Sequence, residues 1–171
     1  MNVIDEYFPI INRNGEIIGK ATRKECHSGS MLLHPVVHLH IFSKSGSVYL
    51  QKRSLNKDIQ PGKWDTAVGG HVDYGESIDI ALLREAKEEL GLTNIKPHKL
   101  ISYVFQSNIE QEQVNVFCIY VEDDFFATYD PIEIDDARFW SIDEIESAIG
   151  CGILTPNFEQ EFERIRHLIH E

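Results

Sequence analysis

The chain has 171 residues, of which 42% are hydrophobic, and it carries a formal net charge of −12. This length and composition fit one folded domain with a sizeable core and exclude a disordered or fibrous chain. The acidic balance argues against a broad basic surface that binds nucleic acid or an anionic membrane, so an anionic substrate would need local cations.

The cysteines and the N-terminal residues indicate a reducing compartment. Cys26, Cys118 and Cys151 are scattered, and no two of them have CxxC spacing. The N-terminal segment MNVIDEYFPI carries acids where a signal peptide carries basic residues, and no apolar run reaches the roughly 18 residues needed to cross a bilayer. We therefore expect a cytoplasmic protein that binds neither nucleic acid nor membrane.

The first half of the chain has the short apolar runs and turn residues that are typical of β-hairpins. A polar loop, SLNKDIQPGK, follows the second predicted hairpin and leads to the strand-like sequence WDTAVGG. The predicted hairpins join residues 7–11 to 16–20 through the turn NRNG, and residues 36–42 to 48–53 through the turn SKSG.

The second half begins with a well-defined helix. Ser77 is a suitable N-cap and Gly91 a suitable C-terminal stop, and together they frame a helix of about four turns. β-Branched and aromatic residues then predict three further strands. These strands cover residues 99–106, 114–121 and 137–140.

Two helices are predicted at the end of the chain. Ser141 and Glu144 form a capping-box pattern, while Thr155 and Pro156 suit the N-cap and first position of the last helix. Strands interleaved with few helices, without repeats or a low-complexity linker, indicate a single α/β or α+β sandwich domain over residues 1–171. The inner face of the last helix is predicted to consist of Phe158, Phe162, Ile165 and Ile169.

Glu85, Glu88 and Glu89 crowd the central helix. Their i,i+3 and i,i+4 spacing costs a few tenths of a kcal/mol per pair unless a cation neutralises them. A solvated acidic face, with Arg84 paired to Glu88, is the ordinary explanation. The alternative is a cation site, because hard divalent ions take oxygen ligands and bind phosphates. The acids flank an apolar stripe predicted to contain Leu82, Leu83, Ala86 and Leu90.

The residues around these acids favour the cation site, because they resemble the Nudix box, GX5EX7REUXEEXGU, over residues 70–92. Coincidence would produce this pattern at about one start position in 10⁹. Ala86 is smaller than the usual aliphatic residue but still apolar. The matching residues are Gly70, Glu76, Arg84, Glu85, Glu88, Glu89, Gly91 and Leu92.

The resemblance implies a hydrolase that cleaves a diphosphate bond in a nucleoside diphosphate linked to another group. It also implies an α/β/α sandwich with a central mixed sheet and an N-terminal β-hairpin. Glu85, Glu88 and Glu89 would bind Mg²⁺ or Mn²⁺ and Arg84 would orient them. The cation would lower the pKa of a bound water, and one of the carboxylates, which the sequence does not single out, would accept its proton. Gly70 and Glu76 would lie on the substrate side.

A second set of residues resembles type I isopentenyl diphosphate isomerase, a branch of the same family. That enzyme holds a divalent metal with two histidines seven residues apart, a histidine after the catalytic cysteine, and an E-x-E pair. The loop RSLNKDIQPGKW also follows the isomerase pattern and would bring Arg53 and Lys57 to the diphosphate. The matching metal ligands, which suit Mn²⁺, Fe²⁺ or Zn²⁺, are His27, His34, His71, Glu110 and Glu112.

The residues that carry the isomerase chemistry are not preserved. Gly69 occupies the position of the catalytic cysteine, Asn157 that of a late tryptophan, and Glu85 that of an arginine in the isomerase's box. All three departures favour hydrolysis. A non-enzymatic ligand-binding Nudix module is a third alternative, against which the complete set of box acids argues. The fold analogy also suggests a homodimer.

The remaining polar features have no assigned role in this scheme. His38 and His40 share a strand face, match no motif and are expected to be structural. Three other histidines, His98, His167 and His170, are expected at the surface. The acidic tract 122–136 is either a specificity loop or simply exposed.

Overall fold

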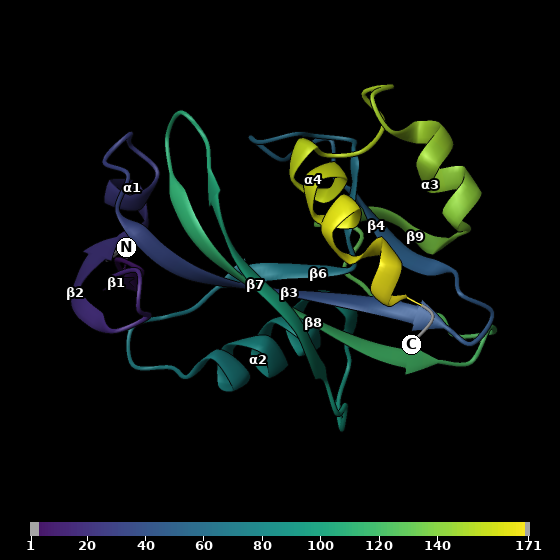
Figure 1. The fold of residues 1–171 in the computed structure, drawn as a ribbon, viewed down its shortest axis with the longest axis horizontal. Helices are drawn as coiled ribbons and strands as arrows, with labels where there is room; N and C mark the ends of the chain where they lie inside the picture. The colour runs from purple at the N-terminus through teal and green to yellow at the C-terminus, as the bar shows by residue number, and fades with distance from the viewer. Residues whose placement is uncertain (1–3, 170–171) are drawn as a thin grey trace.

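The computed structural model describes residues 4–169. A seven-stranded mixed sheet has helices on both of its faces, and a separate two-stranded sheet lies at one end of the molecule (Figure 1). This architecture confirms the predicted α/β/α sandwich with an N-terminal hairpin. The elements are β1 (Tyr7–Ile11), β2 (Ile17–Thr22), α1 (Arg23–Cys26), β3 (Leu33–Ser43), β4 (Val48–Arg53), β5 (Trp64–Thr66), β6 (Val68–His71), α2 (Ile78–Leu90), β7 (His98–Gln106), β8 (Gln111–Val121), β9 (Ile134–Trp140), α3 (Ile142–Ala148), α4 (Pro156–Ile165) and the 3-10 turn Arg166–Leu168.

The centre of the large sheet is the parallel pair β3 and β8. These strands stay in register from Leu33 opposite Gln111 to Ser43 opposite Val121. β7 pairs antiparallel with β8, and β6 pairs antiparallel with β3. β4 adjoins β3 at one position and pairs antiparallel with β5 and β9.

Alternation along β3 sends successive side chains to opposite faces of the sheet. Val37, Leu39 and Ile41 pack toward α2, whereas Val36 and Phe42 pack toward α3 and α4. In Figure 1, α2 lies below the central strands and α4 above them. The inner face of the last helix is as predicted, since Phe158, Phe162, Ile165 and Ile169 are all buried.

Helix α2 has the predicted ends but not the predicted apolar stripe. Ser77 Oγ accepts a hydrogen bond from the Ile80 amide, and Gly91 ends the helix in the left-handed conformation at φ 64°. The prediction for Leu83 was wrong, because this side chain is 46% exposed and Ala81 is buried instead. The buried face is therefore rotated toward Glu85 and Glu89, the residues one and two turns after Ala81.

The N-terminal hairpin β1–β2 carries a short helix that the sequence reading did not predict. Thr22 and Glu25 form a reciprocal capping box at the start of α1. The helix is only four residues long, so it leaves no hydrophobic periodicity to detect. The hairpin and α1 share a small hydrophobic core, which contains Phe8, Ile10, Ala21 and Cys26. Helix α1 turns the chain back toward β3 and thereby positions His27.

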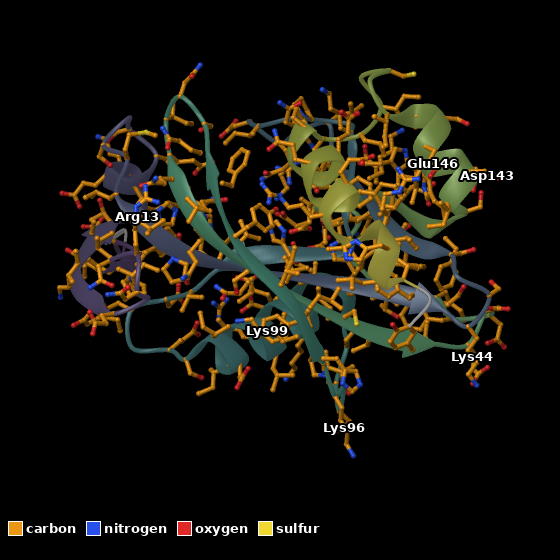
Figure 2. All side chains as sticks on the ribbon, viewed as in Figure 1. Arg13, Lys44, Lys96, Lys99, Asp143 and Glu146 are labelled. Atoms are coloured by element: carbon orange, nitrogen blue, oxygen red, sulfur yellow. The ribbon has the colours of Figure 1, made fainter. Side chains whose placement is uncertain are left out.

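The charged surface shows no single basic face among the side chains that Figure 2 labels. Arg13, Lys44 and Lys96 are exposed and lie in three separate parts of the molecule (Figure 2). Within residues 4–169, no helix is both long and apolar enough to cross a membrane.

Candidate functional site

A cavity of about 800 Å³ lies where the N-terminal hairpin, β6, α2, the β7–β8 turn and the start of α4 meet. Its lining includes most of the residues that the motifs indicated. Those predicted residues are His27, Arg53, Lys57, Gly70, His71, Arg84, Glu85, Glu88, Glu89, Glu110 and Glu112.

One wall of the cavity forms where the paired glycines of β6 meet the acids of α2. Glu89 Oε2 accepts a hydrogen bond from the Gly69 amide at 2.9 Å. A Cβ atom at Gly70 would lie only 2.1 Å from Cδ of Glu85. Two successive residues without side chains therefore let both carboxylates approach the strand, while Glu88 lies closer to solvent.

Burial changes the protonation of these acids. Removal from water, followed by the nearby charge of Glu85, raises the pKa of Glu89 to about 8. Burial also raises the pKa of Glu85, although Arg84 opposes the shift. Two half-buried, neighbouring carboxylates accommodate negative charge poorly unless a cation is present, and oxygen donors of this kind fit Mg²⁺ or Mn²⁺.

Arg84 organises this wall. Its Nε and Nη2 donate to the two carboxylate oxygens of Glu76 at 2.6 and 2.9 Å, and its Nη1 donates to Glu85 Oε1 at 2.8 Å. The same guanidinium donates to the His71 carbonyl at 3.1 Å and approaches Glu88 at 3.4 Å. Glu76 thus fixes Arg84. It is not among the residues lining the cavity, although it was expected on the substrate side.

The second predicted set also comes together, from four different parts of the chain. His27 follows α1, His34 lies on β3, His71 ends β6, and Glu110 and Glu112 come from the β7–β8 turn and β8. One ligand atom from each of these residues, the His/Glu cluster, lies within 4.8 Å of the others. The shortest separations are 3.0 Å between His27 Nε2 and Glu110 Oε2 and 3.2 Å between His27 Nε2 and His71 Nε2.

The state of the histidines in the His/Glu cluster suits metal binding. His34 Nδ1 contacts the Leu32 carbonyl at 2.8 Å, which can only accept, so the hydrogen is on Nδ1 and the Nε2 lone pair faces the cluster. That Nε2 is buried without a hydrogen-bond partner among the described residues. Burial lowers the pKa of His34 and lowers that of His71 well below its usual value. Neutral imidazoles beside two carboxylates fit a divalent cation.

Burial also affects the acid partner in the cluster. Removal from water and the nearby Glu110 raise the pKa of Glu112 to about 7.

The Phe8 ring stacks on His71 with centroids 4.4 Å apart and an interplanar angle of 2°. The N-terminal hairpin therefore both covers the cluster and fixes the plane of one of its imidazoles.

Basic residues from the end of β4 and from the loop after it reach the same cavity. Arg53 lies 3.9 Å from Asp65, and Lys57 forms an ion pair with Glu133. Arg23, which sequence reasoning did not select, also lines the cavity. These are the local cations that an acidic protein needs near an anionic substrate.

The three positions that depart from the isomerase pattern, Gly69, Glu85 and Asn157, all line the cavity. The structure thus places a glycine and an amide where that pattern would have a thiol and an indole. The acidic tract 122–136 contributes none of the lining residues. Its Thr128 carbonyl lies instead beside Gly91, at the C-terminal end of α2.

Sequence reasoning missed one buried group. Glu161 on α4 is fully buried and forms hydrogen bonds with both His38 and His40. The i,i+2 spacing of the histidines signalled a shared strand face, but no local pattern pointed to a carboxylate on the last helix.

Comparisons with known proteins agree with this geometry. Residues 32–160 match the NUDIX domain family. An uncharacterized Nudix hydrolase of Listeria monocytogenes is 30% identical over 90% of both chains. An isopentenyl-diphosphate Delta-isomerase of Brevibacterium linens is 29% identical, with 97% of this chain and 94% of the relative covered. The crystal structure of DR0079 from Deinococcus radiodurans superposes with a TM-score of 0.80 at 23% identity, covering 93% of this chain and 98% of that one. The chain therefore belongs to the Nudix family of enzymes.

Proposed function

We propose that the protein is a metal-dependent hydrolase that cleaves the diphosphate bond of a nucleoside-diphosphate-linked or similar small molecule. The observation that carries this proposal is the approach of Glu85 and Glu89 to the glycine pair Gly69–Gly70 inside the cavity. These half-buried carboxylates on adjacent turns could face a cation and its anionic ligand.

Glu85, Glu88 and Glu89 would hold Mg²⁺ or Mn²⁺ in this site. When bound, such a cation neutralises charge on a diphosphate and activates water for attack at phosphorus. The other residues position these groups. Arg84 holds Glu85 in place through the fork it shares with Glu76, and Arg53 and Lys57 attract the anionic substrate.

The His/Glu cluster would hold a second divalent cation. Its three imidazoles suit Mn²⁺, Fe²⁺ or Zn²⁺ better than Mg²⁺. The unpartnered Nε2 of His34 supports this assignment, because a buried nitrogen without a partner is costly unless a ligand satisfies it.

Glu89→Gln tests the hydrolase directly. Purified protein with Mg²⁺ or Mn²⁺ is incubated with nucleotide sugars, dinucleotides, nucleoside triphosphates and isoprenoid diphosphates, and products are followed by phosphorus NMR. We expect a new phosphate resonance that the Glu89→Gln variant produces at least about 100-fold more slowly. Equal turnover by the variant on a confirmed substrate would refute the assigned site. Tight ligand binding without product would favour a binding module.

An isopentenyl diphosphate isomerase is the second candidate function. It is supported by the assembled His/Glu cluster and by the relative from Brevibacterium linens. It is opposed by Gly69, which supplies no thiol to protonate the substrate's double bond. Deuterium uptake from solvent into isopentenyl diphosphate, measured by mass spectrometry, distinguishes the two, because the hydrolase predicts none.

A further inference from the structure

A buried carboxylate lies beneath the cavity and gathers hydrogen-bond donors from three strands. Glu161 accepts from His38 Nδ1 at 2.9 Å, from His40 Nε2 at 2.8 Å and from the Tyr103 hydroxyl at 2.9 Å. Thr66 Oγ1 donates at a longer distance of 3.4 Å. A carboxylate that is saturated in this way holds each donor ring in one orientation.

The two histidines bound to Glu161 differ in what their second nitrogen faces. His40 is fully buried, and its Nδ1 has no hydrogen-bond partner among the described residues. His38 lines the cavity, and no hydrogen bond to residues 4–169 involves its Nε2. The role of His40 therefore ends at Glu161, whereas His38 presents a free ring edge to the cavity.

The free edge of His38 adjoins the residue that holds Glu89. A Cβ atom at Gly69 would lie 3.3 Å from His38 Cδ2 and 3.6 Å from its Nε2. The Gly69 amide is the donor to Glu89. Because Gly69 has no side chain, the imidazole edge of His38 and the Glu89 carboxylate both lie next to this residue of β6.

The charges around the His38 ring favour its protonated form. Burial opposes the imidazolium, but Glu161 outweighs it, with smaller contributions from Asp65 and Glu112, and raises the pKa of His38 to about 9. With Nδ1 committed to Glu161, the protonated ring carries a hydrogen on Nε2 that points toward the cavity.

We propose that His38 is a further substrate-contacting residue, whose Nε2 donates a hydrogen bond to a diphosphate oxygen beside the Glu85–Glu89 wall. Glu161 is the positioning residue that aims the ring. This inference rests on the proposed function, because it places a diphosphate in this cavity. A hydrogen bond from an imidazolium to a phosphate oxygen is charge-assisted and therefore specific for anions.

Two substitutions of His38 test the roles of its two ring nitrogens separately. The amide of Asn reaches the position of Nδ1 and can still meet Glu161, whereas the longer Gln amide reaches the position of Nε2. We expect His38→Asn to be the more stable variant and to lose about 10- to 100-fold in kcat/KM. We expect His38→Gln to be less stable and to retain more activity. His40→Gln, which keeps a donor to Glu161 away from the cavity, serves as the matched control with activity near wild type.

A purely structural role for His38 would keep this order of stability but reverse the order of activity. If the ring only anchored Glu161, the Asn variant would exceed the Gln variant in both melting temperature and kcat/KM, and the inference would be overturned. Reversed orders of stability and activity support the contact with substrate.

A binding measurement keeps this inference separate from the hydrolase. The protein is labelled with ¹⁵N at histidine and titrated with inorganic pyrophosphate and Mg²⁺, and the His38 signals are assigned by their loss in His38→Asn. We expect the His38 Nε2 resonance to shift and that of His40 to stay. An unchanged His38 resonance at excess pyrophosphate overturns the inference whether or not the wild type hydrolyses any substrate. Absent turnover with a shifted resonance would count against the hydrolase alone.

Discussion

Gly70 is the position on β6 at which an added side chain would collide with an acid of α2. A Cβ atom added to Gly70 would overlap the end of the Glu85 side chain, which is flexible, so the strand itself need not move. We expect Gly70→Ala to keep a melting temperature close to wild type and to displace the Glu85 carboxylate. A displacement of about 1 Å in a catalytic group costs about 100-fold in rate.

A matched glycine provides the control for this substitution. Gly19 on β2 also has a conformation open to other residues, and a Cβ there would meet nothing within 4 Å. Gly19→Ala should leave both turnover and melting temperature unchanged. If Gly70→Ala proved as active as Gly19→Ala, the close approach of Glu85 to β6 would not matter for the chemistry.

At the residue scale, the sequence allowed residues within short motifs to be predicted, but not a contact between two residues that lie in no motif. The residues of the box and of the His/Glu cluster could be selected because each lies within a short motif with fixed spacing. Glu161 could not, since its partner His38 is 123 residues away and nothing near either residue indicates the other. Leu83 was misplaced because the stripe was centred on leucines, whereas the two alanines of α2 mark the face closest to the sheet.

Helix α4 is tied to the large sheet by the hydrogen bonds of Glu161, and these make its docking sensitive to pH. Burial opposes the charged form of Glu161, but the charge and hydrogen bonds of His38 and His40 outweigh it and lower its pKa. This contribution to stability is present above the ordinary value of 4.5 and is lost as the pH falls below it. The contribution of His38, whose pKa is raised, is complete below 6.5 and is lost as the pH rises through about 9.

The free energy of unfolding should show this window. We expect the wild type to exceed His38→Asn by about 1 to 3 kcal/mol between pH 4.5 and 6.5, and the gap to close as the pH approaches 9. Urea unfolding over this range measures it. His167→Asn, which removes an exposed histidine outside the network, should show no such window. A gap that persisted or widened above pH 9 would contradict the assigned charges.

The elements themselves were largely predictable because their turns and caps carry explicit signals. Residues Val48–Arg53 were predicted to the residue, and the caps Ser77, Ser141 and Thr155 all accept the expected hydrogen bonds. The ends of β3 and β8 were not, since Leu33 and Gln111 extend these strands beyond their apolar runs. Pairing to each other, rather than local preference, sustains these ends.

At the scale of the whole molecule, the His/Glu cluster joins the N-terminal hairpin to the large sheet. His27 belongs to the hairpin side, and the Gly29 amide donates to the Ile109 carbonyl at 2.9 Å beside it. Occupation of the cluster by a cation would therefore stabilise the contact between these two parts. A ligand at a hundredfold excess over its Kd adds about 2.7 kcal/mol, which corresponds to about 5 to 10 °C in Tm for a chain of this size.

Chelation tests this link. We expect EDTA followed by gel filtration to lower the Tm and to accelerate amide hydrogen exchange in β1, β2 and α1 more than in β4 or α3. Restoring Mn²⁺ or Zn²⁺ should reverse both effects in the wild type but not in His27→Ala. Uniform acceleration across the sheet, or recovery in the variant, would exclude the cluster as the source.

The parallel register of β3 and β8 also constrains how the protein can fold. His34 lies opposite Glu112 in that register, and the residues on either side of Glu112 are Gln111 and Gln113. A slip of one residue would set an amide, rather than a carboxylate, opposite His34. The two strands are separated in the chain by β4 to β7 and by α2, so their pairing is a slow, long-range step. The His/Glu cluster is therefore complete only in chains whose central strands have closed in the correct alignment, and uptake of a metal ion during refolding would report the correctly paired fraction.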